Sequence, residues 1–96
     1  MERLIPVRPP THRILINADD LGVSPARDEG IFECFRAGAI TAASLLVDGA
    51  DATAAAAEAV ALDLPLGLHL NLTEGACGIV TLQGSDGRLR GKAGLR

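Results

Sequence analysis

Two adjacent aspartates are the first residues of this sequence whose types and spacing point to chemistry. Asp19 and Asp20 directly follow a short apolar run, and two carboxylates so close together raise one pKa unless a cation or a hydrogen-bond donor relieves the repulsion. A divalent metal ion would do so, with one carboxylate as its ligand and the other as the base for a water molecule. From the dipeptide alone, an Asp20 that faces solvent or caps the turn near Gly22 is the ordinary alternative.

His69 is the second candidate. It lies in a run of alternating leucines, and its phase places it with Gly67 and Asn71 on the face away from them. A histidine in this position is either a core residue whose ring nitrogens are hydrogen-bonded or a metal ligand. The small residue Gly67 leaves room beside it. If the sheet curls so that its first and third strands face each other, Asp20 and His69 can share one cation.

The other histidine and the two cysteines carry weaker signals. We expect His12, in a proline-rich segment, to be exposed, and Cys34 to belong to the apolar core face of a helix, while Cys77 has no base near it. Two cysteines without a CxxC pair give no disulfide framework, which favours a reducing compartment and a cytoplasmic protein. The N-terminus does not resemble a signal peptide.

Strands and helices must position these side chains. Sequence patterns typical of strands and of helices alternate along the chain. Short apolar runs predict strands, and capping residues and an alanine-rich stretch predict two helices between them. The predicted strands cover residues 13–17, 41–47 and 66–72, with a turn over 18–22; the predicted helices cover residues 24–37 and 51–62. The last helix ends before Pro65.

This order predicts an α/β fold with a β-α-β-α-β arrangement. Right-handed crossovers between consecutive strands give a parallel sheet, and such sheets gather their functional loops at the carboxyl ends of the strands. Those ends carry Asp19 and Asp20, then Asp48 and Gly49, and then residues 69–74. The candidate ligands are therefore expected at one edge of the sheet.

Composition and charge narrow the function classes. Of the 96 residues, 48% are hydrophobic, but 16 are alanine and none is Trp or Tyr, so one domain with a thin core is expected. A net charge of −3 argues against nucleic-acid binding. No uncharged stretch exceeds the length of residues 37–47, which is far shorter than the roughly 20 residues of a membrane span. We expect an irregular lead-in over 1–12, a core over 13–75 and an irregular, solvated basic tail over 76–96.

Three stretches of the sequence are ILINADDLGVS at 14–24, TAASLLV at 41–47 and GLHLNLTEG at 67–75. Together, and in family order, they resemble the YdjC-like carbohydrate deacetylases, also called the ChbG family. The resemblance implies the N-terminal part of a (β/α)-barrel-like fold. It also implies a metal-dependent hydrolase that removes acetyl groups from N-acetylated sugars such as chitooligosaccharides.

Carried onto this sequence, the resemblance implies that Asp19 is the general base and that Asp20 and His69 are metal ligands. The implied cofactor is a divalent ion, Mg²⁺ or Zn²⁺, and the implied partner is an acetylated sugar, with no nucleic acid and no membrane. No residue is assigned to substrate binding.

The sequence also departs from the family. Family members are much longer and use a further histidine ligand downstream, whereas no histidine follows His69. We therefore expect a single incomplete catalytic domain over 1–96 that binds a metal weakly, because catalytic zinc sites usually supply three protein ligands. One alternative is a non-catalytic fragment or assembly piece that pairs through an open sheet edge, as a homo-oligomer or with another chain. Another is a related amidase that acts on a lipid-linked or other non-oligosaccharide substrate.

Overall fold

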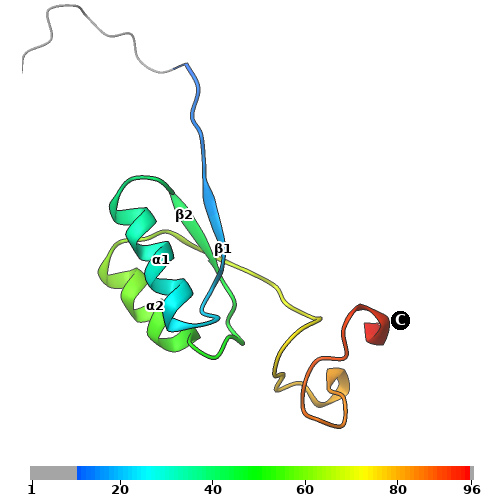
Figure 1. Ribbon diagram of the computed structural model, residues 1–96. Helices are drawn as coiled ribbons and strands as arrows, with labels where there is room; N and C mark the ends of the chain where they lie inside the picture. Colours follow the sequence, from blue (N-terminus) through cyan, green and yellow to red (C-terminus); the bar gives the residue numbers. More distant parts are fainter. Residues whose placement is uncertain (1–10, 96) are drawn as a thin grey trace, which may run out of the picture.

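The computed structural model describes residues 11–95, which form a three-stranded parallel sheet with two helices on one face (Figure 1). The strand order is β1-β2-β3, and both pairings are parallel. The elements are β1 (Asn17–Leu21), α1 (Pro25–Arg36), β2 (Ala42–Leu45), α2 (Ala52–Ala61) and β3 (Leu66–Leu68), followed by the 3-10 helices η1 (Val80–Leu82) and η2 (Lys92–Leu95). The predicted α/β fold with its β-α-β-α-β order is confirmed.

Both helices lie within one residue of their predicted bounds, α1 with a side-chain cap and α2 without one. The hydroxyl of Ser24 accepts a hydrogen bond from the backbone N–H of Arg27, and Pro25 occupies the first turn of α1. Gly38, with φ +76°, follows the C-cap of α1 in the left-handed conformation that ends many helices. Helix α2 begins after Asp51 and consists mostly of alanine, the strongest helix former.

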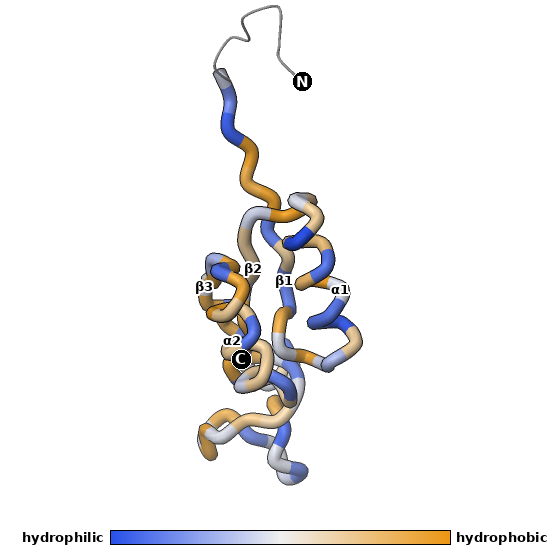
Figure 2. The backbone as a smooth tube through the Cα atoms, turned by 90° about the vertical axis from the view of Figure 1, so that its left-hand side faces the viewer, coloured by the Kyte–Doolittle hydropathy of each residue, from blue (hydrophilic) through white to orange (hydrophobic). Residues whose placement is uncertain are grey.

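The first strand lies further along the chain than predicted. The apolar run over 13–17 was expected to be the strand, but β1 begins at Asn17 and includes Asp19 and Asp20, so the predicted turn over 18–22 is also wrong. Ile14 and Leu15 are 76% and 85% exposed, and Figure 2 shows this apolar segment in orange just before β1. The reason is pairing: β2 begins opposite Asn17, so the preceding residues have no strand beside them in the described part of the chain.

The second and third strands are shorter than their sequence patterns. β2 is confined to the residues that pair with β1 and β3, and β3 stops at Leu68. The last backbone hydrogen bond between the second and third strands runs from the N–H of His69 to the carbonyl of Leu45, over 2.9 Å. The chain then turns away, so the leucine alternation predicted over 66–72 continues beyond the sheet.

The hydrophobic core lies between the sheet and the helices, and half of its buried members are alanine. Its buried members are Leu21, Phe32, Ala43, Ala55, Ala59 and Leu64. The prediction that Cys34 belongs to this core is wrong, because its side chain is exposed. Two residues along a helix correspond to a rotation of about 200°, so Cys34 faces away when Phe32 faces the sheet.

Residues 76–95 form a separate irregular segment beyond the sheet (Figure 1). Antiparallel bridges join Ala76 to Arg88 and Gln83 to Leu89, and Leu89 is buried. A tight turn over residues 84–87 is closed by the hydrogen bond from the N–H of Gly87 to the carbonyl of Gly84. Among the described residues, no helix has the length and apolar character needed to cross a membrane.

Candidate functional site

A β-bulge determines where Asp20 lies. The pairing register between β1 and β2 shifts between Ala18 and Leu21, so β1 carries an extra residue there. The backbone of Asp20 has φ +67°, a left-handed conformation that aspartate tolerates better than most side chains. Since bulges redirect side chains, the two adjacent aspartates do not have the alternating directions of a regular strand.

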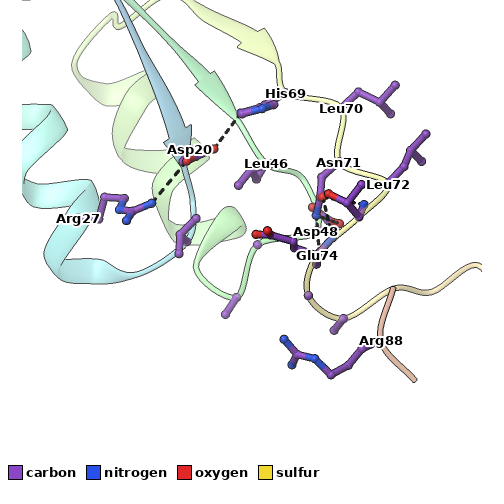
Figure 3. Close-up of a pocket in the computed structure, with 16 residues that line it drawn as sticks. Asp20, Arg27, Leu46, Asp48, His69, Leu70, Asn71, Leu72, Glu74 and Arg88 are labelled. Carbon is purple, nitrogen blue, oxygen red and sulfur yellow. Dashed lines mark hydrogen bonds and ion pairs between the residues drawn. The ribbon is translucent and has the colours of Figure 1, made fainter. Parts of the chain in front are cut away.

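Asp20, near the carboxyl end of β1, meets His69, which directly follows β3 (Figure 3). Nδ1 of His69 lies 3.1 Å from Oδ1 of Asp20, and Nη1 of Arg27 lies 3.5 Å from Oδ2 of the same carboxylate. The Nδ1 atom is buried and has no partner in hydrogen-bonding geometry, although the Asp20 oxygen is close. The structure thus brings together the two residues that the sequence nominates as metal ligands.

The two side chains fit a divalent cation. An imidazole nitrogen and a carboxylate oxygen are both ligands that Zn²⁺ accepts, whereas Mg²⁺ and Mn²⁺ favour the carboxylate oxygen. Two ligands about 2.1 Å from one ion lie about 3.0–3.4 Å apart in octahedral or tetrahedral geometry, so the observed 3.1 Å is compatible with a shared ion, as it is with a direct histidine–carboxylate ion pair. Within residues 11–95, no group of three or more His, Cys, Asp and Glu side chains is placed to hold a metal ion. The described chain therefore offers two ligands.

Asp19 is placed differently. Its Oδ1 accepts a hydrogen bond of 2.8 Å from Nδ2 of Asn17, which also donates to Oγ of Ser44 on β2. Asp19 is exposed and does not line the pocket that contains Asp20 and His69. The carboxylates of Asp19 and Asp20 therefore lie in different surroundings, although the two residues are adjacent in the sequence.

A pocket of about 800 Å³ surrounds the Asp20–His69 pair, within the range of small-molecule sites. It lies where the ends of the three strands meet the segment after β3 (Figure 3). Its polar lining includes Asp20, Arg27, Asp48, His69, Asn71, Glu74 and Arg88, and its apolar lining includes Val23, Leu46, Leu70 and Leu72. The pocket therefore offers both hydrogen-bonding groups and apolar surface to a ligand.

Asn71 organises one wall of this pocket. Its Nδ2 donates to Oδ2 of Asp48 over 3.0 Å and to the carbonyl of Glu74 over 2.6 Å. Its Oδ1 accepts from the backbone N–H groups of Thr73 and Glu74. Sequence reasoning placed Asn71 beside His69 but missed this role; the available signal was the asparagine itself, which commonly closes turns through its side chain.

Asp28 anchors the turn that follows Asp20. It is 2% exposed, and its Oδ1 accepts a 2.8 Å hydrogen bond from the N–H of Gly22. The carbonyl of Gly22 in turn accepts from the N–H of Asp51, which joins the turn after β1 to the turn after β2. Burial, followed by the neighbouring Asp51 carboxyl group, raises the pKa of Asp28 above its ordinary value of 3.8. The position of Asp28 in the first turn of α1 indicates by itself only a favourable interaction with the helix dipole.

Comparison with known proteins gives a consistent set of relatives. The family described as YdjC-like protein matches residues 13–96. Human carbohydrate deacetylase is 46% identical over 93 residues, which cover 91% of this chain and 29% of the human protein. Carbohydrate deacetylase of Listeria monocytogenes serotype 4a is 38% identical over 84 residues, covering 81% of this chain and 34% of that protein. This chain thus spans about a third or less of the length of these relatives.

One solved structure is also similar. It is the crystal structure of an Enterococcus faecalis V583 protein, provisionally described as a cellobiose-phosphate cleavage protein, and the TM-score is 0.73. The two chains are 27% identical over a match that covers 82% of this chain and 34% of the other.

Proposed function

This chain belongs to the YdjC-like family, and from that premise we propose that it supplies part of the catalytic domain of a metal-dependent carbohydrate deacetylase. The substrates would be N-acetylated sugars such as chitooligosaccharides. The observation that carries the proposal is the 3.1 Å approach of His69 Nδ1 to Asp20 Oδ1, with Nδ1 buried and lacking a hydrogen-bond partner. The relatives named carbohydrate deacetylase support the hydrolytic class of reaction.

In this proposal Asp20 and His69 hold a divalent ion, Mg²⁺ or Zn²⁺. Such an ion supplies Lewis acidity toward the acetamide carbonyl and toward a water molecule. Arg27 holds Oδ2 of Asp20, which leaves Oδ1 facing His69. Their shared position at the carboxyl end of a parallel sheet is where such folds place functional groups.

Asp19 is the proposed general base. Asn17 holds its Oδ1, and its second oxygen would take a proton from the water that attacks the acetyl carbonyl. The C–N bond of the acetamide then breaks, the amine nitrogen receives a proton, and acetate and the free amino sugar leave. The contact between Asp20 and His69 supports the ligand role of Asp20, whereas the role of Asp19, which does not line this pocket, is proposed from the family resemblance.

A second candidate function is assembly through the open sheet edge. Leu68 and Leu70, on and just after the edge strand β3, are 68% and 69% exposed. An exposed apolar edge strand is a template for pairing with another chain. Association that depends on protein concentration and not on a metal ion would favour this role.

Calorimetric titration of the 96-residue chain with Mg²⁺ and Zn²⁺ tests the metal site. We expect Asp20→Asn and His69→Ala each to weaken binding at least about tenfold, or about 1.4 kcal/mol. Acetate release from N,N′-diacetylchitobiose is measured in the same samples.

Two matched variants serve as controls. His12→Ala removes the other histidine, and Asp63→Asn makes the same change at another aspartate with positive φ. Both should bind metal like the wild type. If the wild type and the four variants all bind metal equally, the Asp20–His69 contact is an ordinary polar contact. The proposal then loses its basis.

A further inference from the structure

Asp48 lines the candidate pocket but has no part in the proposed hydrolysis. It follows the carboxyl end of β2, the strand between those that carry Asp20 and His69. Its side chain is exposed, and Figure 3 shows it past the end of β2, next to Asn71. It does not complete a three-ligand metal group with them, because the described residues contain none. A carboxylate in this position is available to a ligand.

The orientation of this carboxylate is fixed from one side. Nδ2 of Asn71 donates to Oδ2 of Asp48, and Asn71 is itself held by three hydrogen bonds to the backbone of Thr73 and Glu74. Oδ1 of Asp48 accepts no hydrogen bond from residues 11–95. A polar group held by its neighbours in this way loses less freedom when it binds a ligand.

The chemistry of the pocket favours a hydroxyl-bearing ligand with an apolar face. A carboxylate oxygen accepts short, strong hydrogen bonds from hydroxyl groups. Leu70 and Leu72, which follow β3, are 69% and 37% exposed and line the same pocket. A sugar ring presents both features, because its hydroxyls lie around the rim and its C–H groups form apolar faces.

We propose that Asp48, oriented by Asn71, accepts a hydrogen bond from a sugar hydroxyl in a subsite next to the Asp20–His69 pair. This inference rests on the proposed deacetylase function and adds a residue that determines which ligands are bound. A site built to accept a hydroxyl discriminates strongly against analogues that lack the donor.

Calorimetric binding of N,N′-diacetylchitobiose to the 96-residue chain tests the subsite. We expect Asp48→Asn to weaken binding about tenfold, because a charged acceptor is lost. Asp63→Asn makes the same substitution outside the pocket and should bind the sugar like the wild type. Circular dichroism of each variant checks that the fold is retained.

The fully O-methylated disaccharide separates hydrogen bonding from a general effect on structure. It has no hydroxyl donors, so the wild type should bind it about tenfold more weakly than chitobiose, and Asp48→Asn should show little difference between the two ligands. A wild type that binds both ligands equally, or an Asp48→Asn variant that matches the wild type with chitobiose, would overturn the subsite.

Metal titration of the same samples distinguishes this inference from the proposed function. Sugar binding that depends on Asp48 without any metal binding would leave the subsite in place and remove the metal-dependent hydrolase. Metal binding through Asp20 and His69 without sugar binding would do the opposite.

Discussion

At the scale of single residues, the left-handed backbone of Asp20 limits what can replace it. Its φ of +67° costs most L-residues roughly 1–2 kcal/mol, whereas glycine, asparagine and aspartate adopt it more easily. We predict that Asp20→Ala lowers the free energy of unfolding by about 1 kcal/mol relative to Asp20→Gly and Asp20→Asn. Urea denaturation of the three variants measures this order. If alanine were as stable as glycine here, the strain at this bulge would be negligible.

Asp28 makes stability depend on pH in a direction that follows from its raised pKa. Because the folded state holds this proton more tightly than the unfolded state, stability falls as pH rises from about the ordinary value of 3.8 through the raised value. Asp28→Asn is neutral at every pH, and its amide oxygen can still accept from the N–H of Gly22. We therefore predict that, as pH rises from about 3.8 through the raised pKa, Asp28→Asn becomes more stable relative to the wild type.

Urea denaturation between pH 4 and pH 8 checks this prediction, with Asp63→Asn as an exposed control. Asp51 and Arg27 are the charged groups beside Asp28, and Arg27 partly opposes the rise in pKa. Parallel stability curves for wild type and Asp28→Asn would show that Asp28 does not titrate in this range.

The sequence predicts part of the site at this scale. Carboxyl ends of parallel strands meet at one edge, so topology predicts that Asp20 and His69 lie at the same edge of the sheet, but the position of Asp20 also depends on the bulge in β1. The surroundings of Asp19 cannot be predicted in this way, because they depend on a β-bulge that no pattern of residues in the sequence predicts. The burial of Asp28 escapes prediction for a similar reason: its hydrogen bond to Gly22 exists only once the turn has formed.

At the scale of elements, the turns after β1 and β2 cross in very close contact. A Cβ atom at Gly49 would overlap the carbonyl oxygen of Gly22, and that carbonyl accepts the N–H of Asp51. Overpacking of this kind costs about 1–3 kcal/mol. We predict that Gly49→Ala lowers the free energy of unfolding by about that amount and weakens metal binding, because the same turn follows Asp20.

Gly30→Ala is the matched control for this prediction. Gly30 lies inside α1, and nothing lies within 4 Å of an added Cβ there. The substitution should raise stability by about 0.5–1 kcal/mol because alanine favours the helix. Thermal and chemical denaturation of both variants give the comparison, and a Gly49→Ala protein as stable as Gly30→Ala would contradict the close packing of the two turns.

The helices were predictable because their signals are local: Ser24 and Pro25 begin α1, and alanines build α2. The strands were less predictable, because a strand forms only where another strand lies beside it. Ile14 and Leu15 have strong strand propensity but no neighbouring strand in the described structure, and they are exposed.

At the scale of the whole molecule, the chain is extended and leaves much apolar surface open to solvent. Its radius of gyration is 18.2 Å, against about 12–13 Å for a compact domain of this length. Both β1 and β3 are edge strands of the sheet. We predict that the 96-residue chain associates as its concentration rises, and that Leu68→Lys reduces this association.

Sedimentation velocity over a range of concentrations measures the effect. Val60→Lys is the control, because Val60 is 74% exposed but lies on α2 and away from the sheet edge. Equal association by the two lysine variants and the wild type would show that β3 does not form the contact.

The approach of Asp20 to His69 also has a meaning for folding kinetics. The two residues belong to opposite ends of the sheet order and are separated by both helices and β2. An ion held between them would act as a reversible cross-link that closes this long stretch of chain, as a disulfide closes a loop. Unfolding would then have to break the cross-link before β1 and β3 could part, so the ion would lengthen the lifetime of the folded state.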